Sequence, residues 1–102
     1  IMPFFNEEET LQTAVLKLLK EDFASEIILV NDGSNDSSRE IALRLIKKYK
    51  NIKLVDSKMN KGKGHALKIG INKSKTKYIG VLDADLEYSS VNIHEFVRVE
   101  QK

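Results

Sequence analysis

The sequence of 102 residues contains no cysteine, a single proline and no long apolar run. Without cysteine, neither a disulfide-stapled scaffold nor a thiolate metal site can form. A membrane-spanning helix needs about 18 or more consecutive apolar residues, and no stretch approaches that length. The first residues do not resemble a secretory signal, so we expect none in this sequence. These absences favour one ordinary globular domain, for which a hydrophobic fraction of 41% supplies a core.

Basic and acidic residues are unevenly distributed, although the formal net charge is only +2. Residues 47–77 contain eleven lysines against the single acid Asp56, and the flanking segments are net acidic. Such a basic segment indicates either an anionic ligand or a solvated face. A nucleic-acid surface would have a denser basic stripe with interleaved aromatic residues, so we expect no nucleic-acid partner.

Short aliphatic runs alternate with stretches of helical periodicity. The runs predict strands that end near residue 5 and that cover 27–30, 52–55 and 78–82. The periodic stretches predict helices at 7–20, 37–49 and 66–74, and one that begins with Ile93, Phe96 and Val97. Asn6 with Glu9, and Ser37 with Glu40, resemble capping boxes at the first two helix starts.

This alternation predicts an α/β fold with a Rossmann-like, mostly parallel sheet and helices on both faces. Right-handed crossovers bring the carboxyl ends of the strands to one edge, and ligands of such sheets bind outside that edge. The polar clusters of the sequence fall at these ends: Asn6-Glu7, 31–36, Asp56 and 83–87. We therefore expect the functional site at this edge.

Several familiar sites do not occur in the sequence. The run 62–67 imitates a dinucleotide fingerprint, but Leu67 stands at the third glycine position and the run does not follow the first strand. There is neither a P-loop nor a Gly-x-Ser-x-Gly elbow. His65 and His94 lack partner residues at metal-ligand spacing, so we expect no zinc site.

The sharpest feature is Asp83-Ala84-Asp85 at the end of a hydrophobic run. Two carboxylates at a rigid strand end can hold a hard divalent cation, which completes its shell with water and substrate phosphates. Such a cation suits a nucleoside diphosphate whose leaving charge needs neutralising. The alternative is that the two aspartates cap the following turn or helix.

A second cluster begins with Asp32 and Gly33. The carboxylate can accept from a base or ribose group where glycine lets the main chain turn close by, and the alternative is an Asx-type turn. Lys61 can meet phosphates or be solvated. Glu8 and Glu9 fit the dipole at the first turn of a helix, which leaves Glu7 open.

In order along the chain, four motifs resemble those of a family 2 glycosyltransferase of the GT-A fold. They are Met2-Pro3-Phe4-Phe5-Asn6-Glu7-Glu8, Ile28-Leu29-Val30-Asn31-Asp32-Gly33-Ser34-Asn35-Asp36, Asn60-Lys61-Gly62-Lys63-Gly64-His65-Ala66-Leu67 and Leu82-Asp83-Ala84-Asp85-Leu86-Glu87. The resemblance covers essentially the whole chain. It is strongest to the branch of dolichyl-phosphate mannose synthase and bacterial polyprenyl-phosphate sugar transferases.

Carried over by position, the resemblance implies a nucleotide-sugar site made by Pro3, Phe5, Glu7, Asp32, Gly33, Lys61, Asp83, Ala84, Asp85 and Glu87. It implies that Asp32 contacts the base or ribose. It also implies that Asp83 and Asp85 are catalytic and hold Mg²⁺ or Mn²⁺, the DXD motif of the family. Asn31 replaces the first Asp of the family's Asp-Asp-Gly-Ser, and Glu87 stands where that branch often has Gln, which leaves the donor sugar open.

The implied reaction is inverting transfer from a UDP- or GDP-sugar to a lipid-phosphate or saccharide acceptor, in cell-wall or polysaccharide biosynthesis. The implied location is cytoplasmic, with any membrane association made by segments outside this chain. Residues 1–102 would be the N-terminal nucleotide-sugar-binding part of the enzyme, truncated at both ends and inactive alone. Two alternatives are a non-catalytic nucleotide-sugar-binding module and a sugar-phosphate nucleotidyltransferase. The latter is disfavoured because its glycine-rich, arginine-bearing N-terminal loop is absent.

Overall fold

The computed structural model describes residues 1–21, 26–57, 61–74, 78–81, 84 and 95–98. Its elements are β1 (Met2–Phe4), α1 (Leu11–Glu21), β2 (Ile27–Asp32), α2 (Ser38–Lys48), β3 (Ile52–Ser57), α3 (Lys63–Lys73), β4 (Tyr78–Val81) and β5 (Glu95–Arg98). The strands and helices predicted before residue 82 are thus confirmed in kind and order. Among the described helices, none has the length and apolar character needed to span a membrane.

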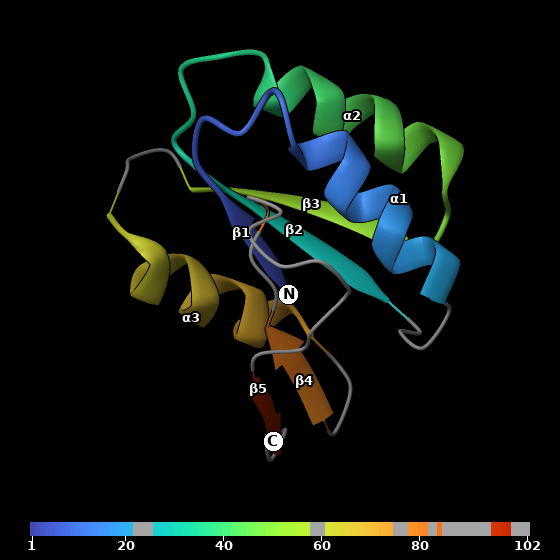
Figure 1. Ribbon diagram of the computed structural model, residues 1–102. Helices are drawn as coiled ribbons and strands as arrows, with labels where there is room; N and C mark the ends of the chain where they lie inside the picture. The colour runs from blue at the N-terminus through green and yellow to red at the C-terminus, as the bar shows by residue number, and fades with distance from the viewer. Residues whose placement is uncertain (22–25, 58–60, 75–77, 82–83, 85–94, 99–102) are drawn as a thin grey trace.

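The first three strands form a parallel sheet in the order β1-β2-β3. Its register places Met2 opposite Leu29, and Ile27 opposite Ile52. The helices α1 and α2 cover one face of this sheet and α3 covers the other (Figure 1). The predicted α/β class, with helices on both faces, is therefore confirmed.

The central strand β2 is buried along its whole length. Ile27 and Leu29 belong to the core beneath α1 and α2, whereas Ile28 and Val30 pack with Ala66 of α3. Successive side chains of a strand point to opposite faces, so a strand between two helical layers needs apolar residues at every position. This requirement explains the unbroken aliphatic run in the sequence.

The strand β4 passes the residue before β1, because the nitrogen of Ile1 donates a hydrogen bond to the carbonyl oxygen of Gly80 at 2.7 Å. The crossover through α3 runs over the face opposite α1 and α2 (Figure 1). β4 and β5 form a separate two-stranded antiparallel sheet. In open α/β sheets, ligands bind outside the carboxyl ends of the parallel strands, which here are the ends of β1, β2 and β3.

The helix predicted from residue 93 is wrong in the part that the structure describes. Glu95–Arg98 is the strand β5, which pairs antiparallel with β4 and places Phe96 opposite Gly80. Phenylalanine and valine favour strands, and pairing with β4 satisfies main-chain groups that local spacing does not reveal. Ile93 lies outside the described residues.

Both predicted capping boxes are also wrong. The helix α1 begins at Leu11 and not at residue 7, after a turn in which the Glu7 carbonyl accepts from the N–H groups of Thr10 and Leu11. At α2, Ser37 makes no side-chain cap, and Asp36 accepts from the N–H of Ser38 instead. Asn6 instead accepts from the N–H of Asn35 in the loop after β2, a partner that the local capping pattern does not indicate.

Candidate functional site

The loops after β1 and β2 are joined by hydrogen bonds at the carboxyl edge of the sheet. The Asn6 N–H donates to Ser34 Oγ at 3.0 Å, and the Asn35 N–H donates back to Asn6 Oδ1 at 2.8 Å. The Glu7 N–H donates to Ser38 Oγ at 2.7 Å. Asn6 has a φ of 51°, a left-handed conformation in which asparagine is enriched. The two loops therefore form one connected unit.

The carboxylates of Glu8 and Asp36 add further hydrogen bonds between these two loops. Glu8 Oε1 accepts from the Ser37 N–H at 3.0 Å, so Glu8 serves the start of α2 and not, as predicted, the first turn of α1. Asp36 accepts from the N–H groups of Glu8 at 3.2 Å and Ser38 at 2.9 Å. Desolvation acts to raise the pKa of Asp36, but the hydrogen bonds from Ser38 and Glu8 outweigh it and hold that pKa below its ordinary value.

Asp32, the last residue of β2, is hydrogen-bonded to the segment that leads into α3. The residue is 5% exposed, and its carboxylate accepts from the N–H of Lys61 at 3.1 Å and the N–H of Gly62 at 3.0 Å. Both donors lie just before the first turn of α3, where the helix dipole favours a negative charge. Gly62 has a φ of 92° and a ψ of 165°, a conformation open essentially only to glycine. The acid thus has a structural partner, and its contact with a nucleotide stays a prediction.

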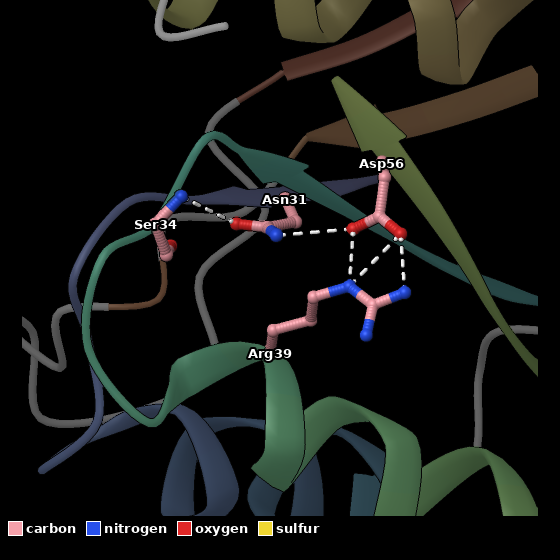
Figure 2. Close-up of polar contacts among 4 residues, drawn as sticks. All are labelled: Asn31, Ser34, Arg39 and Asp56. Atoms are coloured by element: carbon pink, nitrogen blue, oxygen red, sulfur yellow. Dashed lines mark hydrogen bonds and ion pairs between the residues drawn. The ribbon is translucent and has the colours of Figure 1, made fainter. Parts of the chain in front are cut away.

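Asn31 connects the β2 end to β3 and α2 (Figure 2). It stands opposite Asp56 in the sheet, and its Nδ2 donates to Asp56 Oδ1 at 3.0 Å. Its own Oδ1 accepts from the Ser34 N–H at 2.9 Å. Arg39 of α2 donates to the same Asp56 carboxylate from Nε and from Nη2, the latter at 2.9 Å.

The neighbours Arg39 and Asn31 lower the pKa of Asp56. Partial burial acts to raise it, but the hydrogen bonds from Arg39 and Asn31 and the Arg39 charge outweigh that effect, so the pKa lies below its ordinary value. An aspartate at position 31 would face Asp56 with a second carboxylate. The amide of Asn31 avoids this repulsion and donates a hydrogen bond to Asp56 instead.

Thr10 connects the loop after β1 to the segment after β4. Its Oγ1 lies 2.7 Å from the carbonyl oxygen of Ala84 and 2.9 Å from Glu7 Oε2. Ala84 is 4% exposed and belongs to the core beneath α1 and α2. Ala84, which lies between Asp83 and Asp85 in the sequence, is therefore bonded to the loop that follows β1.

The structure places the predicted site residues as follows. Pro3 is buried within β1, Phe5 is 37% exposed just after it, and Glu7 is half-buried beside Thr10. Gly33 has a φ of 74°, a left-handed turn that leads away from β2. Lys61 is exposed and lies two residues before the start of α3. Asp83, Asp85 and Glu87 lie outside the described residues, so their roles stay predictions.

The sequence analysis did not identify Thr10, Ser38 and Arg39 as residues of this edge. Ser38 lies two residues beyond the polar cluster 31–36, so that cluster was the available signal. No local pattern pairs Thr10 with Ala84, which is 74 residues away. Arg39 could have been matched to Asp56 only after the register of β2 and β3 was known.

The donor chemistry of a cation site can be assessed from the residues at this edge. Among the described residues, no group of three or more histidines, cysteines or acids comes together. Carboxylates at positions 83 and 85 would flank the anchored Ala84, and carboxylate oxygens are suitable ligands for Mg²⁺ or Mn²⁺. The donor set therefore fits such a cation only together with oxygens from substrate or water.

Comparison with known proteins gives a consistent result. The family "Glycosyl transferase family 2" matches residues 1–99. A poly-beta-1,6-N-acetyl-D-glucosamine synthase of Staphylococcus epidermidis is 38% identical over 86 residues, which are 83% of this chain and 21% of that protein. A dolichyl-phosphate beta-glucosyltransferase of Dictyostelium discoideum is 37% identical over 111 residues, covering 98% of this chain and 33% of that protein.

Among solved structures, a mannosyltransferase from Pyrobaculum calidifontis in complex with GDP-Man and Mn²⁺ is similar to this chain with a TM-score of 0.76. The sequence identity is 21%, and the match covers 82% of this chain and 26% of that protein, so this likeness concerns the fold. The chain thus spans about a fifth to a third of the length of the proteins that it matches.

Proposed function

The chain belongs to glycosyl transferase family 2, and on that basis we propose that it is the nucleotide-sugar-binding part of an inverting glycosyltransferase. One observation carries the proposal: the loops after β1 and β2 are hydrogen-bonded to each other at the carboxyl edge of the sheet, and Thr10 in the first of them is bonded to Ala84. The contact with Thr10 brings Ala84, the residue between Asp83 and Asp85, to the loop after β1, and this supports a site in which the two aspartates lie at the same edge. This edge is where open α/β sheets bind nucleotides.

The proposed reaction is the attack of an acceptor oxygen on the anomeric carbon of a UDP- or GDP-sugar. The bond from that carbon to the diphosphate oxygen breaks, the nucleoside diphosphate leaves, and the anomeric configuration inverts. Asp32 and Glu7 would face the nucleoside, with Pro3, Phe5 and Gly33 shaping the pocket around it. Lys61 would face the phosphates, where a cation offsets their charge.

Asp83 and Asp85 would hold the Mg²⁺ or Mn²⁺ ion that the family resemblance implies, and Glu87 would lie toward the sugar. When bound, such an ion stabilises the charge that develops on the leaving diphosphate. The role of the chain is to keep the two carboxylates at the strand end, and the buried position of Ala84 between them supports this. Carboxylates that are already held in place need not reorient as charge develops on the leaving diphosphate.

The acceptor is proposed to be a lipid phosphate or a saccharide. One relative is named as a dolichyl-phosphate glucosyltransferase and another as a polysaccharide synthase, which supports both classes. A phosphate acceptor is already deprotonated near neutral pH, whereas a hydroxyl acceptor needs a base. The two classes therefore differ in the residues that the complete site must supply.

The test is incubation of the intact protein with labelled UDP- and GDP-sugars, Mn²⁺, and either polyprenyl phosphate or an oligosaccharide, with mass analysis of the products. A glycosylated acceptor supports the proposal. In a parallel incubation with a sugar phosphate and a nucleoside triphosphate, release of pyrophosphate would instead indicate a nucleotidyltransferase. Binding without any product would indicate a non-catalytic module.

The variant Asp83→Ala tests the cation-binding role. It should abolish turnover and weaken Mn²⁺-dependent binding of UDP or GDP. The control is Glu40→Gln on the exposed side of α2, which removes an acid outside the site and should leave both unchanged. Tight nucleotide binding that survives Asp83→Ala and chelation of the metal would contradict the role of Asp83.

A further inference from the structure

Thr10 makes an unusual use of its hydroxyl. A threonine just before a helix commonly accepts a hydrogen bond from an N–H of the first turn. Here the hydroxyl instead lies 2.7 Å from the Ala84 carbonyl and 2.9 Å from Glu7 Oε2. Both neighbours are acceptors, so the hydroxyl donates its single hydrogen to one of them at a time. Thr10 therefore connects two segments that the chain separates widely.

The Ala84 carbonyl is the more consequential of these partners. Ala84 is 4% exposed, and a buried carbonyl requires a hydrogen-bond donor. This carbonyl belongs to the planar peptide that joins Ala84 to Asp85. Holding its oxygen restricts rotation of the main chain at Ala84.

We propose that Thr10 is a positioning residue for the DXD segment, an inference that rests on the proposed function. It acts through the Ala84 carbonyl and does not itself touch the donor. Glu7 shares the same hydroxyl, so Thr10 joins the nucleoside side of the site to its diphosphate side. Nothing in the local sequence around Thr10 or Ala84 indicates this connection.

The test uses three substitutions of Thr10 and one matched control in the intact protein. Thr10→Val and Thr10→Ala remove the hydroxyl, and Thr10→Ser retains it. Thr13→Val makes the same chemical change at an exposed position of α1, one turn along the helix. Calorimetry gives the dissociation constants of UDP and GDP, each measured with Mn²⁺ and with EDTA.

Thr10→Val should reduce the gain in nucleotide affinity that Mn²⁺ provides by about fivefold to tenfold, the usual effect of one lost hydrogen bond. Its affinity in EDTA should stay within about twofold of wild type, because the nucleoside contacts remain. Thr10→Ser and Thr13→Val should retain the full Mn²⁺ gain. If Thr10→Val does not fold, the comparison of Thr10→Ala with Thr10→Ser decides the same point.

The possible failures are distinguishable. If wild type gains affinity with Mn²⁺ and Thr10→Val gains just as much, the inference about Thr10 is wrong and the proposed function stands. If the hydroxyl-deficient variants lose affinity equally in Mn²⁺ and in EDTA, Thr10 acts only on the fold of the loop and the inference is again wrong. If wild type binds neither nucleotide, the proposed function fails and the inference fails with it.

Discussion

Gly62 offers a quantitative test of the segment that Asp32 holds. Its φ of 92° and ψ of 165° lie in a region that costs other residues about 1–3 kcal/mol. A Cβ added there would meet nothing within 4 Å, so the cost of Gly62→Ala is backbone strain and not a clash. Alanine also lowers the conformational entropy of the unfolded chain, which stabilises the folded protein by about 0.4–1 kcal/mol. The expected net loss in the free energy of unfolding is about 1–2 kcal/mol.

Gly64 is the matched control, because it lies two residues away inside α3 and a Cβ there also meets nothing within 4 Å. Gly64→Ala should stabilise the protein by about 0.5–1 kcal/mol, since alanine is the better helix former. Urea denaturation of the intact protein, followed by circular dichroism, measures both variants. Equal stabilities for the two variants would refute the assignment of a glycine-only conformation to Gly62.

Three further predictions concern the carboxylates at the sheet edge. Asp32→Asn turns an amide donor toward a main-chain N–H, so it should lower the free energy of unfolding by about 1.5–3 kcal/mol in urea denaturation. An unchanged urea midpoint would contradict the hydrogen bonds from Lys61 and Gly62 to Asp32. Because the pKa of Asp56 is depressed, its pairing with Arg39 contributes fully above the ordinary carboxyl value of 3.8 and is lost as the pH falls through the lower folded value. The difference in urea midpoint between wild type and Arg39→Gln should therefore shrink between pH 6 and pH 3, and a constant difference would refute the pairing. Asn31→Asp should cost about 1–3 kcal/mol at pH 7, where two carboxylates face each other, and a variant as stable as wild type would be inconsistent with the contact in Figure 2.

The sequence predicts the layers of this fold well because burial leaves a local signature. The unbroken run Ile27–Val30 indicates a strand covered on both faces, and the structure buries it between α1, α2 and α3. Helix periodicity likewise identifies which face of each helix is apolar. Both signals are carried by neighbours in sequence, so they can be read without knowing the fold.

The connections at the carboxyl edge could not be predicted in the same way. Glu8 resembles a residue of its own helix, yet it bonds to the N–H of Ser37 in the next loop. Asp32 resembles a free acid at a strand end, yet it accepts from Lys61 and Gly62. These bonds depend on which loops the crossovers bring together, and on strand register, so they become visible only in three dimensions.

The end of the chain shows a different limit. Phe96 and Val97 sit at positions compatible with a helix and have side chains that favour a strand. Pairing with β4 decides in favour of the strand. For a segment this short, the hydrogen-bonding partner carries the information that the local sequence lacks.

The most direct test of the proposed site is a crystal structure of the intact protein with UDP or GDP and Mn²⁺. We expect the nucleotide outside the carboxyl ends of β1 and β2, with the diphosphate and the ion at Asp83 and Asp85. Thr10 should remain bonded to the Ala84 carbonyl in that complex. A nucleotide bound at the opposite edge of the sheet, or on the outer face of α3, would contradict the proposed site.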